Sequence, residues 1–181
     1  PTSFSGKVEF IEDDLINSKS LKKIPNVNIS DFIRVPILDC FQDKRTRRIS
    51  NKQECIDRIW CIGGQVGWYY AKVLWELRGY IDKLVGGDGL RIGRTQKGII
   101  RAGDTIDFWH VLYANKEEGR LLLFAEMKLP GEAWLEFKVS GDNLEQTATF
   151  RPKGIWGQIY WYAVLPLHNF IFTGMINNLA K

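Results

Sequence analysis

The chain has 181 residues, of which 45% are hydrophobic, so a single domain can bury a core without a disulfide or a metal to stabilise it. The net charge of +4 is too small to indicate nucleic acid as a partner, and we expect none. Three cysteines without regular spacing and only two histidines argue against a disulfide framework and against a metal site.

Residues 1–30 differ from the rest of the chain, because they are polar, rich in Ser, Asn, Lys and Asp, and show little periodicity. We interpret them as an N-terminal extension that precedes a domain spanning residues 31–181. Residues 1–20 contain acidic side chains and lack the apolar segment of a signal peptide. We therefore expect a cytoplasmic protein.

A strand and two helices are predicted next. Residues 43–50 have the pattern of a short strand, and we expect their basic run, Lys44 to Arg48, to be a solvated face. Ser50 is placed to cap a helix that ends at Gly63, and a second helix is predicted from about Trp68 to Val85. In both segments apolar residues recur every three or four positions.

Four strands are predicted after these helices, at residues 105–114, 120–129, 133–139 and 144–151. The connections between them are short, so neighbouring strands should be antiparallel. Alternate residues of the last three strands are mostly apolar and share one face of the sheet. Another element has to cover that face.

The segment 155–176 contains no charged residue over twenty-two positions. That length can span a bilayer, but Gln158, His168 and Asn169 are costly in hydrocarbon. We therefore expect a core helix that covers the apolar face of the sheet, and no membrane partner.

The glycine-rich run from Gly86 to Arg94 is the most suggestive local motif, because glycines beside arginines can hold a phosphate. A helix precedes the run, however, and no β-α-β unit surrounds it, so it does not match a dinucleotide-binding fingerprint. It also lacks the Gly-Lys-Ser/Thr sequence of a P-loop. We expect no phosphate site there.

The ionisable residues form no recognisable catalytic motif. His110 and His168 each lie in an apolar stretch, where a histidine is usually a hydrogen-bonded core residue. Glu126 and Glu136 are near neighbours on adjacent strands, but a lysine follows each of them two residues later, which favours solvated cross-strand charge pairs. We therefore assign no catalytic residue, no metal ligand and no cofactor.

Several dense motifs stand out between residues 62 and 168. They are Ile62–Gly64 with Gly67–Tyr70, Leu74-Trp75 with Leu77–Gly79, Gly86–Arg91 with Gly93-Arg94, Gly103-Asp104 with Asp107–Trp109, Ala125–Gly131 with Ala133–Phe137, and Tyr160–Tyr162 with Pro166 and His168. Together they resemble an uncharacterised bacterial domain family of unknown function, over about residues 40–181. The order of elements resembles the START-like, or polyketide-cyclase-like, superfamily.

This resemblance implies an α+β helix-grip fold, in which a curved antiparallel sheet wraps around a long C-terminal helix and two shorter helices follow the first strand. Domains of this family often follow a short-chain-dehydrogenase-like NAD(P)-binding domain, which implies such an oxidoreductase as a partner in trans. No Gly-x-Gly-x-x-Gly motif opens the present chain, so hydride chemistry does not carry over from the resemblance.

A START-like fold also implies a cavity between the sheet and the long helix, which favours a small apolar or amphipathic ligand. The alternation of side chains between the two faces of each strand, together with the fold of the family, suggests ten candidate ligand-binding residues. The walls would be formed by Trp109, Met127, Leu135, Phe137, Phe150, Trp161 and Leu165, with Trp68, Tyr69 and Arg78 near the mouth.

Alternative functions belong to different classes. The chain could be a cyclase- or dehydratase-like enzyme that uses Glu126 or Asp107 with His110, an accessory domain of an NAD(P)-dependent oxidoreductase, or a membrane-attached interaction domain that uses residues 155–176. A desolvated ionisable pair deep in the cavity would favour the enzyme.

Overall fold

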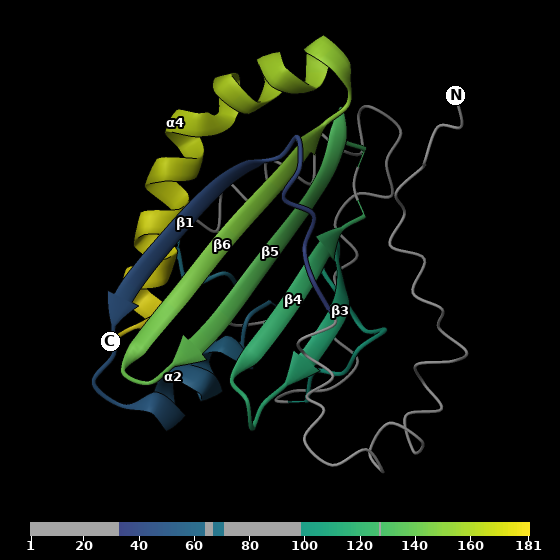
Figure 1. The fold of residues 1–181 in the computed structure, drawn as a ribbon. Coiled ribbons are helices and arrows are strands. Elements are labelled where there is room, and N and C mark those ends of the chain that lie inside the picture. The colour runs from purple at the N-terminus through teal and green to yellow at the C-terminus, as the bar shows by residue number, and fades with distance from the viewer. Residues whose placement is uncertain (1–32, 64–66, 71–98, 127) are drawn as a thin grey trace. The chain divides into compact units, whose positions relative to one another are not determined.

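The fold is taken from a computed structural model of the chain, which describes residues 33–63, 67–70, 99–126 and 128–181. All of the helices and strands named below belong to one compact unit, Val35–Lys181. Within that unit a six-stranded antiparallel sheet is covered on one face by a long C-terminal helix (Figure 1).

The first strand, β1 (Phe41–Arg48), is followed by a short helix, α2 (Lys52–Ile59). Asn51 caps this helix, because its side-chain oxygen accepts hydrogen bonds from the backbone amides of Gln53 at 3.0 Å and Glu54 at 3.2 Å. The cap is therefore one residue later than the predicted Ser50. An Asn reaches the same two amides that a Ser would reach.

Five further strands complete the sheet. They are β2 (Thr105–Ile106), β3 (Trp109–Asn115), β4 (Arg120–Ala125), β5 (Gly131–Ser140) and β6 (Asn143–Pro152). The strand order is β1-β6-β5-β4-β3-β2, and every neighbouring pair is antiparallel. β1 thus forms an edge of the sheet, next to the last strand in sequence.

The predicted strands 43–50, 133–139 and 144–151 differ from β1, β5 and β6 by one or two residues at an end, whereas two others differ more. The predicted strand 105–114 is divided into β2 and β3 at Asp107, whose φ of 55° places it in the left-handed region, where a strand cannot continue. β4 ends at Ala125 instead of Leu129. The amide of the next residue, Glu126, donates to Phe108 O at 2.9 Å rather than extending the ladder with β5.

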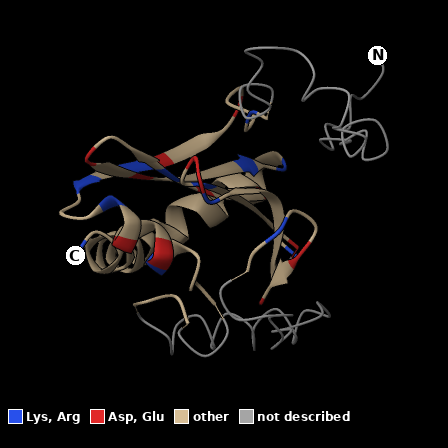
Figure 2. Ribbon diagram, turned by 90° about the horizontal axis from the view of Figure 1, so that it is seen from below, with Lys and Arg blue, Asp and Glu red and all other residues tan. Residues whose placement is uncertain are grey.

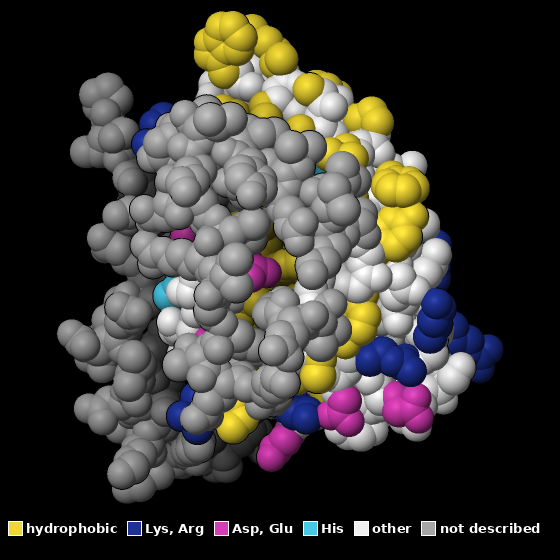
Figure 3. Space-filling model, turned by 180° about the vertical axis from the view of Figure 1, so that it is seen from behind, with side chains coloured by type: hydrophobic (Ala, Val, Ile, Leu, Met, Phe, Trp, Pro, Cys, Tyr) yellow, Lys and Arg dark blue, Asp and Glu magenta, His cyan; other side chains and the backbone are white. Residues whose placement is uncertain are grey.

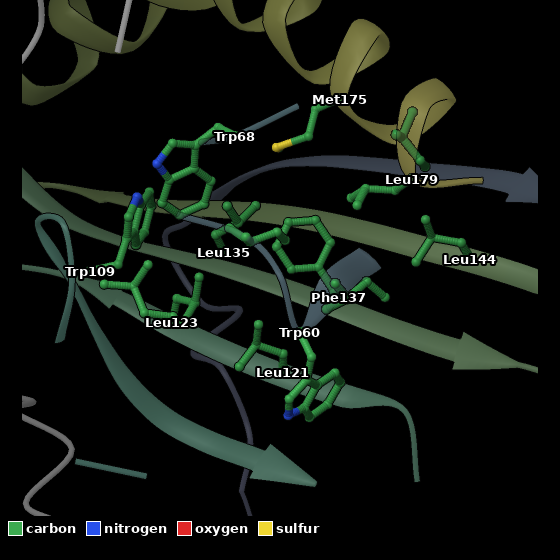
Figure 4. Packing of buried hydrophobic residues seen from close by; sticks show 14 of the residues in the cluster. Trp60, Trp68, Trp109, Leu121, Leu123, Leu135, Phe137, Leu144, Met175 and Leu179 are labelled. Atoms are coloured by element: carbon green, nitrogen blue, oxygen red, sulfur yellow. The ribbon is translucent and has the colours of Figure 1, made fainter. Parts of the chain in front are cut away.

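The C-terminal helix, α4, spans Gly154–Leu179 and contains Pro166. It bends along its length beside β1 and β6 (Figure 1), as expected for a helix in which a proline removes one backbone donor. Its C-terminal half packs on the sheet (Figure 4). The fully buried side chains in this contact are Leu121, Leu123, Leu135, Phe137, Leu144, Met175, Ile176 and Leu179.

Polar contacts attach the same half of α4 to β1. The guanidinium of Arg45 makes two hydrogen bonds to the Asp43 carboxylate, and it also donates to the Asn169 carbonyl oxygen at 3.0 Å and to the hydroxyl of Thr173. Arg47 Nε donates to Asn177 Oδ1 at 2.8 Å. The basic run was predicted to be a solvated face. Arg45 instead faces α4, and its side chain is 14% exposed.

The predicted α+β fold, a curved antiparallel sheet with a long C-terminal helix, is confirmed. The first of the two predicted shorter helices is α2. The second was predicted to begin at about Trp68, but residues 68–70 form a turn and a bend, with Tyr69 at a φ of 59°. Residues 71–85 and the glycine-rich run 86–94 lie outside the described residues.

Candidate functional site

A small cavity lies between the sheet and the middle of α4. Its volume is about 40 Å³, which is enough for about two or three water molecules or for one small functional group. Its lining is almost entirely apolar and aromatic. The lining residues are Trp109, Ala125, Leu129, Ala133, Trp134, Ala148, Thr149, Phe150, Tyr160, Trp161, His168 and Phe172.

Three alanines on adjacent strands explain why space remains there. Ala125 of β4, Ala133 of β5 and Ala148 of β6 lie on the face of the sheet that is turned toward α4, at one end of the core. Further along the same face, β5 carries Leu135 and Phe137, which are fully buried. The alanine side chains are too small to fill the space under the helix, whereas Leu135 and Phe137 fill it further along.

Aromatic rings of β6 and α4 form one wall of the cavity, and Phe41 of β1 stacks on this wall. The indole of Trp161 lies parallel to the ring of Phe41, with centroids 5.4 Å apart, and to the ring of Phe150, with centroids 5.8 Å apart. The imidazole of His168 meets the same indole edge-on at 5.5 Å. Such ring pairs stabilise a defined geometry in addition to the area that they bury, so this wall is rigid.

Trp109 also lines the cavity and carries a polar group, its indole N–H. Its side chain is 6% exposed, and its indole nitrogen, Nε1, has no hydrogen-bond acceptor among the described residues. In Figure 4 this nitrogen lies on the side of the ring that is turned toward Trp68 and α4. Leaving a buried donor unsatisfied costs about 1–3 kcal/mol, so an acceptor from beyond the described residues would be favoured here.

Trp68 provides a contrast with Trp109, because its indole nitrogen donates to Asp107 Oδ2 at 2.8 Å. The two indoles are adjacent, with centroids 6.0 Å apart. Burial raises the pKa of the Asp107 carboxyl above its usual value, and the hydrogen bond from Trp68 opposes that rise. Asp107 is therefore a half-buried acid beside the cavity, but it does not line it.

The groups considered for acid–base chemistry lie elsewhere. His110 Nδ1 is 3.5 Å from Glu126 Oε1, and these side chains are 29% and 43% exposed. Neither residue lines the cavity. Burial raises the pKa of the Cys55 thiol to about 11, so this cysteine remains protonated and is a poor nucleophile. Within the described part of the chain no three side chains are grouped to hold a metal ion.

The structure brings three of the predicted ligand-binding residues to the cavity wall, namely Trp109, Phe150 and Trp161. Leu135 and Phe137 face the same side of the sheet but lie in the solid core.

The remaining predicted residues have other positions. Trp68 is buried beside Trp109, whereas Tyr69 packs against the core and its carbonyl oxygen accepts a hydrogen bond from Asn178 at 2.8 Å. Leu165 is 38% exposed on α4. Arg78 and Met127 lie outside the described residues.

The sequence analysis did not identify the alanines of the site, nor Tyr160 and His168, as residues that line the cavity. Ala125, Ala133 and Ala148 carry the useful signal, because each is a small residue at an inward position, with a large apolar residue two positions away on the same face. Tyr160 was noted only as part of a motif, and His168 was considered as a core histidine and not as a residue of the cavity wall. Helical spacing from Trp161 would have placed His168, seven residues later, on the same face of the helix.

Comparison with known proteins gives a family but no activity. No curated protein matches the chain. The model of one family, described as a protein of unknown function (DUF2867), matches residues 40–175, which include every described strand and most of α4. The chain therefore belongs to the DUF2867 family of proteins of unknown function.

Proposed function

We propose that this chain is a binding module that receives one small, oxygen-bearing end of an apolar or amphipathic molecule in the cavity beneath α4. The observation that carries this proposal is the buried indole N–H of Trp109, which has no acceptor among the described residues and belongs to an apolar cavity wall. A guest that supplies an acceptor would remove the cost of that unsatisfied donor.

The size and lining of the cavity limit the chemistry of the guest. About 40 Å³ accommodates a carbonyl, carboxylate or hydroxyl group with a few atoms, not a whole drug-sized molecule. The flat rings of Phe150 and Trp161 favour an apolar continuation of the guest. Binding is favoured over a cyclase or dehydratase activity, because Glu126 and His110 lie outside the cavity.

Native mass spectrometry of the chain purified from cells tests this proposal. We expect the unaltered protein to retain a small-molecule mass that is lost on denaturation. Ala148→Leu adds three carbons to the cavity wall and should abolish the retained mass, because the added side chain occupies the space of the guest.

Ala163→Leu is the matched control, since Ala163 is exposed on the other side of α4 and the change adds the same atoms. This variant should retain the same mass as the unaltered protein. A protein without any retained mass, or an equal mass in both variants, would contradict the proposal.

A further inference from the structure

The helix α4 is apolar on both of its faces. One face is buried against the sheet, whereas the other is exposed over the N-terminal two-thirds of the helix. At a rotation of about 100° per residue, the exposed apolar residues other than Leu165 form a single stripe. This stripe, called here the outer face of α4, consists of Ile155, Trp156, Ile159, Tyr162, Ala163, Pro166, Leu167 and Phe170.

The exposure of this outer face is large for a globular domain. Trp156 is 73% exposed and Ile155 is 68% exposed. By length and composition α4 could cross a membrane, yet only 28% of its most apolar window is buried inside the structure. Figure 3 shows hydrophobic side chains continuing along this edge of the molecule. Contiguous exposed apolar surface of this kind marks a site of interaction.

The sequence led us to expect no membrane partner, because an uncharged segment in a globular protein is usually core. That expectation depended on burial of the whole segment. The structure buries the C-terminal half of α4, through Ile171, Phe172 and Met175, and leaves the outer face of the N-terminal part in solvent.

Among the described residues, cations stand at both ends of the outer face. Two acidic side chains near α4 are paired within the protein, since Asp43 pairs with Arg45 and Glu54 pairs with Arg58. Arg47 binds a neutral amide and so retains its full charge. Figure 2 shows the charged residues on strands, turns and α2, whereas α4 itself carries none.

Two further cations complete this basic border. Lys153 is exposed immediately before the first turn of α4, beside Trp156, and Arg48 is exposed at the end of β1. In Figure 3, Lys and Arg side chains gather beyond the far end of the apolar edge, with some Asp and Glu side chains next to them. An uncharged apolar face bordered by cations is complementary to a lipid surface with anionic headgroups.

We propose that the outer face of α4 docks the domain on an anionic lipid surface, with Trp156 and Ile159 inserted below the headgroups and Lys153, Arg47 and Arg48 contacting them. A second copy of the chain is a poorer occupant, because a symmetric contact through this face would bring the same cations together. The glycines that would allow close helix packing, Gly157 and Gly174, also face inward against Pro130 and Tyr70. The proposal is independent of the cavity.

Sedimentation of the whole chain with sucrose-loaded vesicles tests the docking. We expect binding to vesicles that contain phosphatidylserine and weaker binding to phosphatidylcholine alone. Trp156→Glu and Ile159→Glu should each lower the partition coefficient by about tenfold or more, because each replaces an inserted apolar side chain with a charge. Lys153→Ala and Arg48→Ala should each lower it by about fivefold, on the anionic vesicles alone.

Gln158→Glu is the matched control, since it introduces the same charge on the same helix but outside the outer face. It should bind nearly as well as the unaltered chain, and circular dichroism should show all variants folded. The proposal fails if the unaltered chain stays in the supernatant with both vesicles or if Gln158→Glu loses as much binding as Trp156→Glu. It also fails if light scattering shows a dimer that Trp156→Glu converts to a monomer.

Discussion

Asp107 combines three features that rarely occur together in one residue. Its backbone lies in the left-handed region, its carboxylate is half-buried, and that carboxylate accepts a hydrogen bond from Trp68. The backbone conformation costs free energy in a residue other than glycine, although Asp and Asn tolerate it best. The contact between Trp68 and Asp107 therefore fixes the turn that separates β2 from β3 and positions Trp109 at the cavity.

This arrangement predicts a specific dependence of stability on pH. Burial raises the pKa of the folded Asp107 above 3.8, so the folded protein holds this proton more tightly than the unfolded chain does. The contribution of Asp107 to stability is therefore complete at low pH and is lost as the pH rises through the folded-state pKa.

Asp107→Asn removes this titration and keeps both an acceptor for Trp68 and a residue suited to the backbone conformation. Urea denaturation of both proteins at several acidic pH values is the measurement. The free energy of unfolding of the unaltered protein, relative to that of Asp107→Asn, should fall as the pH rises above 3.8. The raised pKa of Asp107 would be contradicted if the free energy of unfolding of the unaltered protein, relative to that of Asp107→Asn, stayed constant or increased with pH.

At the scale of elements, the contact between α4 and the edge strand β1 combines apolar and polar contributions. Phe41 meets Trp161 near the N-terminal part of the helix, and Arg45 binds the backbone and side chains of α4 two turns later. A bidentate pair with Asp43 holds the Arg45 guanidinium in the orientation that these bonds need. This pairing of β1 with α4 sets the height of the helix above the cavity.

Replacing Arg45 should destabilise the fold. Arg45→Ala removes charge-assisted hydrogen bonds to α4 and leaves the poorly exposed Asp43 carboxylate without its partner, which should cost about 2–3 kcal/mol. Arg48→Ala, on the same strand but exposed, is the control and should leave the midpoint of unfolding nearly unchanged. Equal midpoints for the two variants in urea denaturation would show that Arg45 does not attach α4.

Much of this element pattern was predictable. The inward residues of β5 and β6 were identified correctly, because successive side chains of a strand point to opposite faces of the sheet. The position of Arg45 was not predictable, since a basic run at the edge of a sheet looks the same whether it faces water or a helix. The exposed face of α4 was missed for a related reason. A helix that is apolar all round is usually core, and periodicity has no signal to separate its two faces.

The cavity itself was only partly predictable. Trp109, Phe150 and Trp161 followed from parity and from the family resemblance, but the space between them depends on Ala125 and Ala148, whose small size matters only once the register of the strands is known. An unsatisfied indole N–H is a property of three-dimensional geometry, and no sequence pattern reveals it.

For the molecule as a whole, we propose separate roles for the two surfaces of α4. Its inner side closes the cavity through Trp161 and Phe172, and its outer side carries the exposed face that begins at Ile155. The two roles can be separated experimentally, because Ala148→Leu alters the cavity alone and Trp156→Glu alters the outer face alone. Loss of one activity should therefore leave the other intact.

The indole resonances of the chain provide the most direct test of the proposed binding site. The protein contains seven Trp residues, and in protein labelled with ¹⁵N-tryptophan Trp68→Phe and Trp109→Phe each identify one indole N–H. The Trp68 N–H is bonded to Asp107 and serves as an internal reference.

We predict that the Trp109 N–H of the protein as purified resonates at the low field typical of a hydrogen-bonded indole. It should move upfield when the retained molecule is removed by unfolding and refolding, and return when that molecule is added back, while Trp68 stays in place. A Trp109 resonance that is the same before and after removal of the molecule would contradict the account.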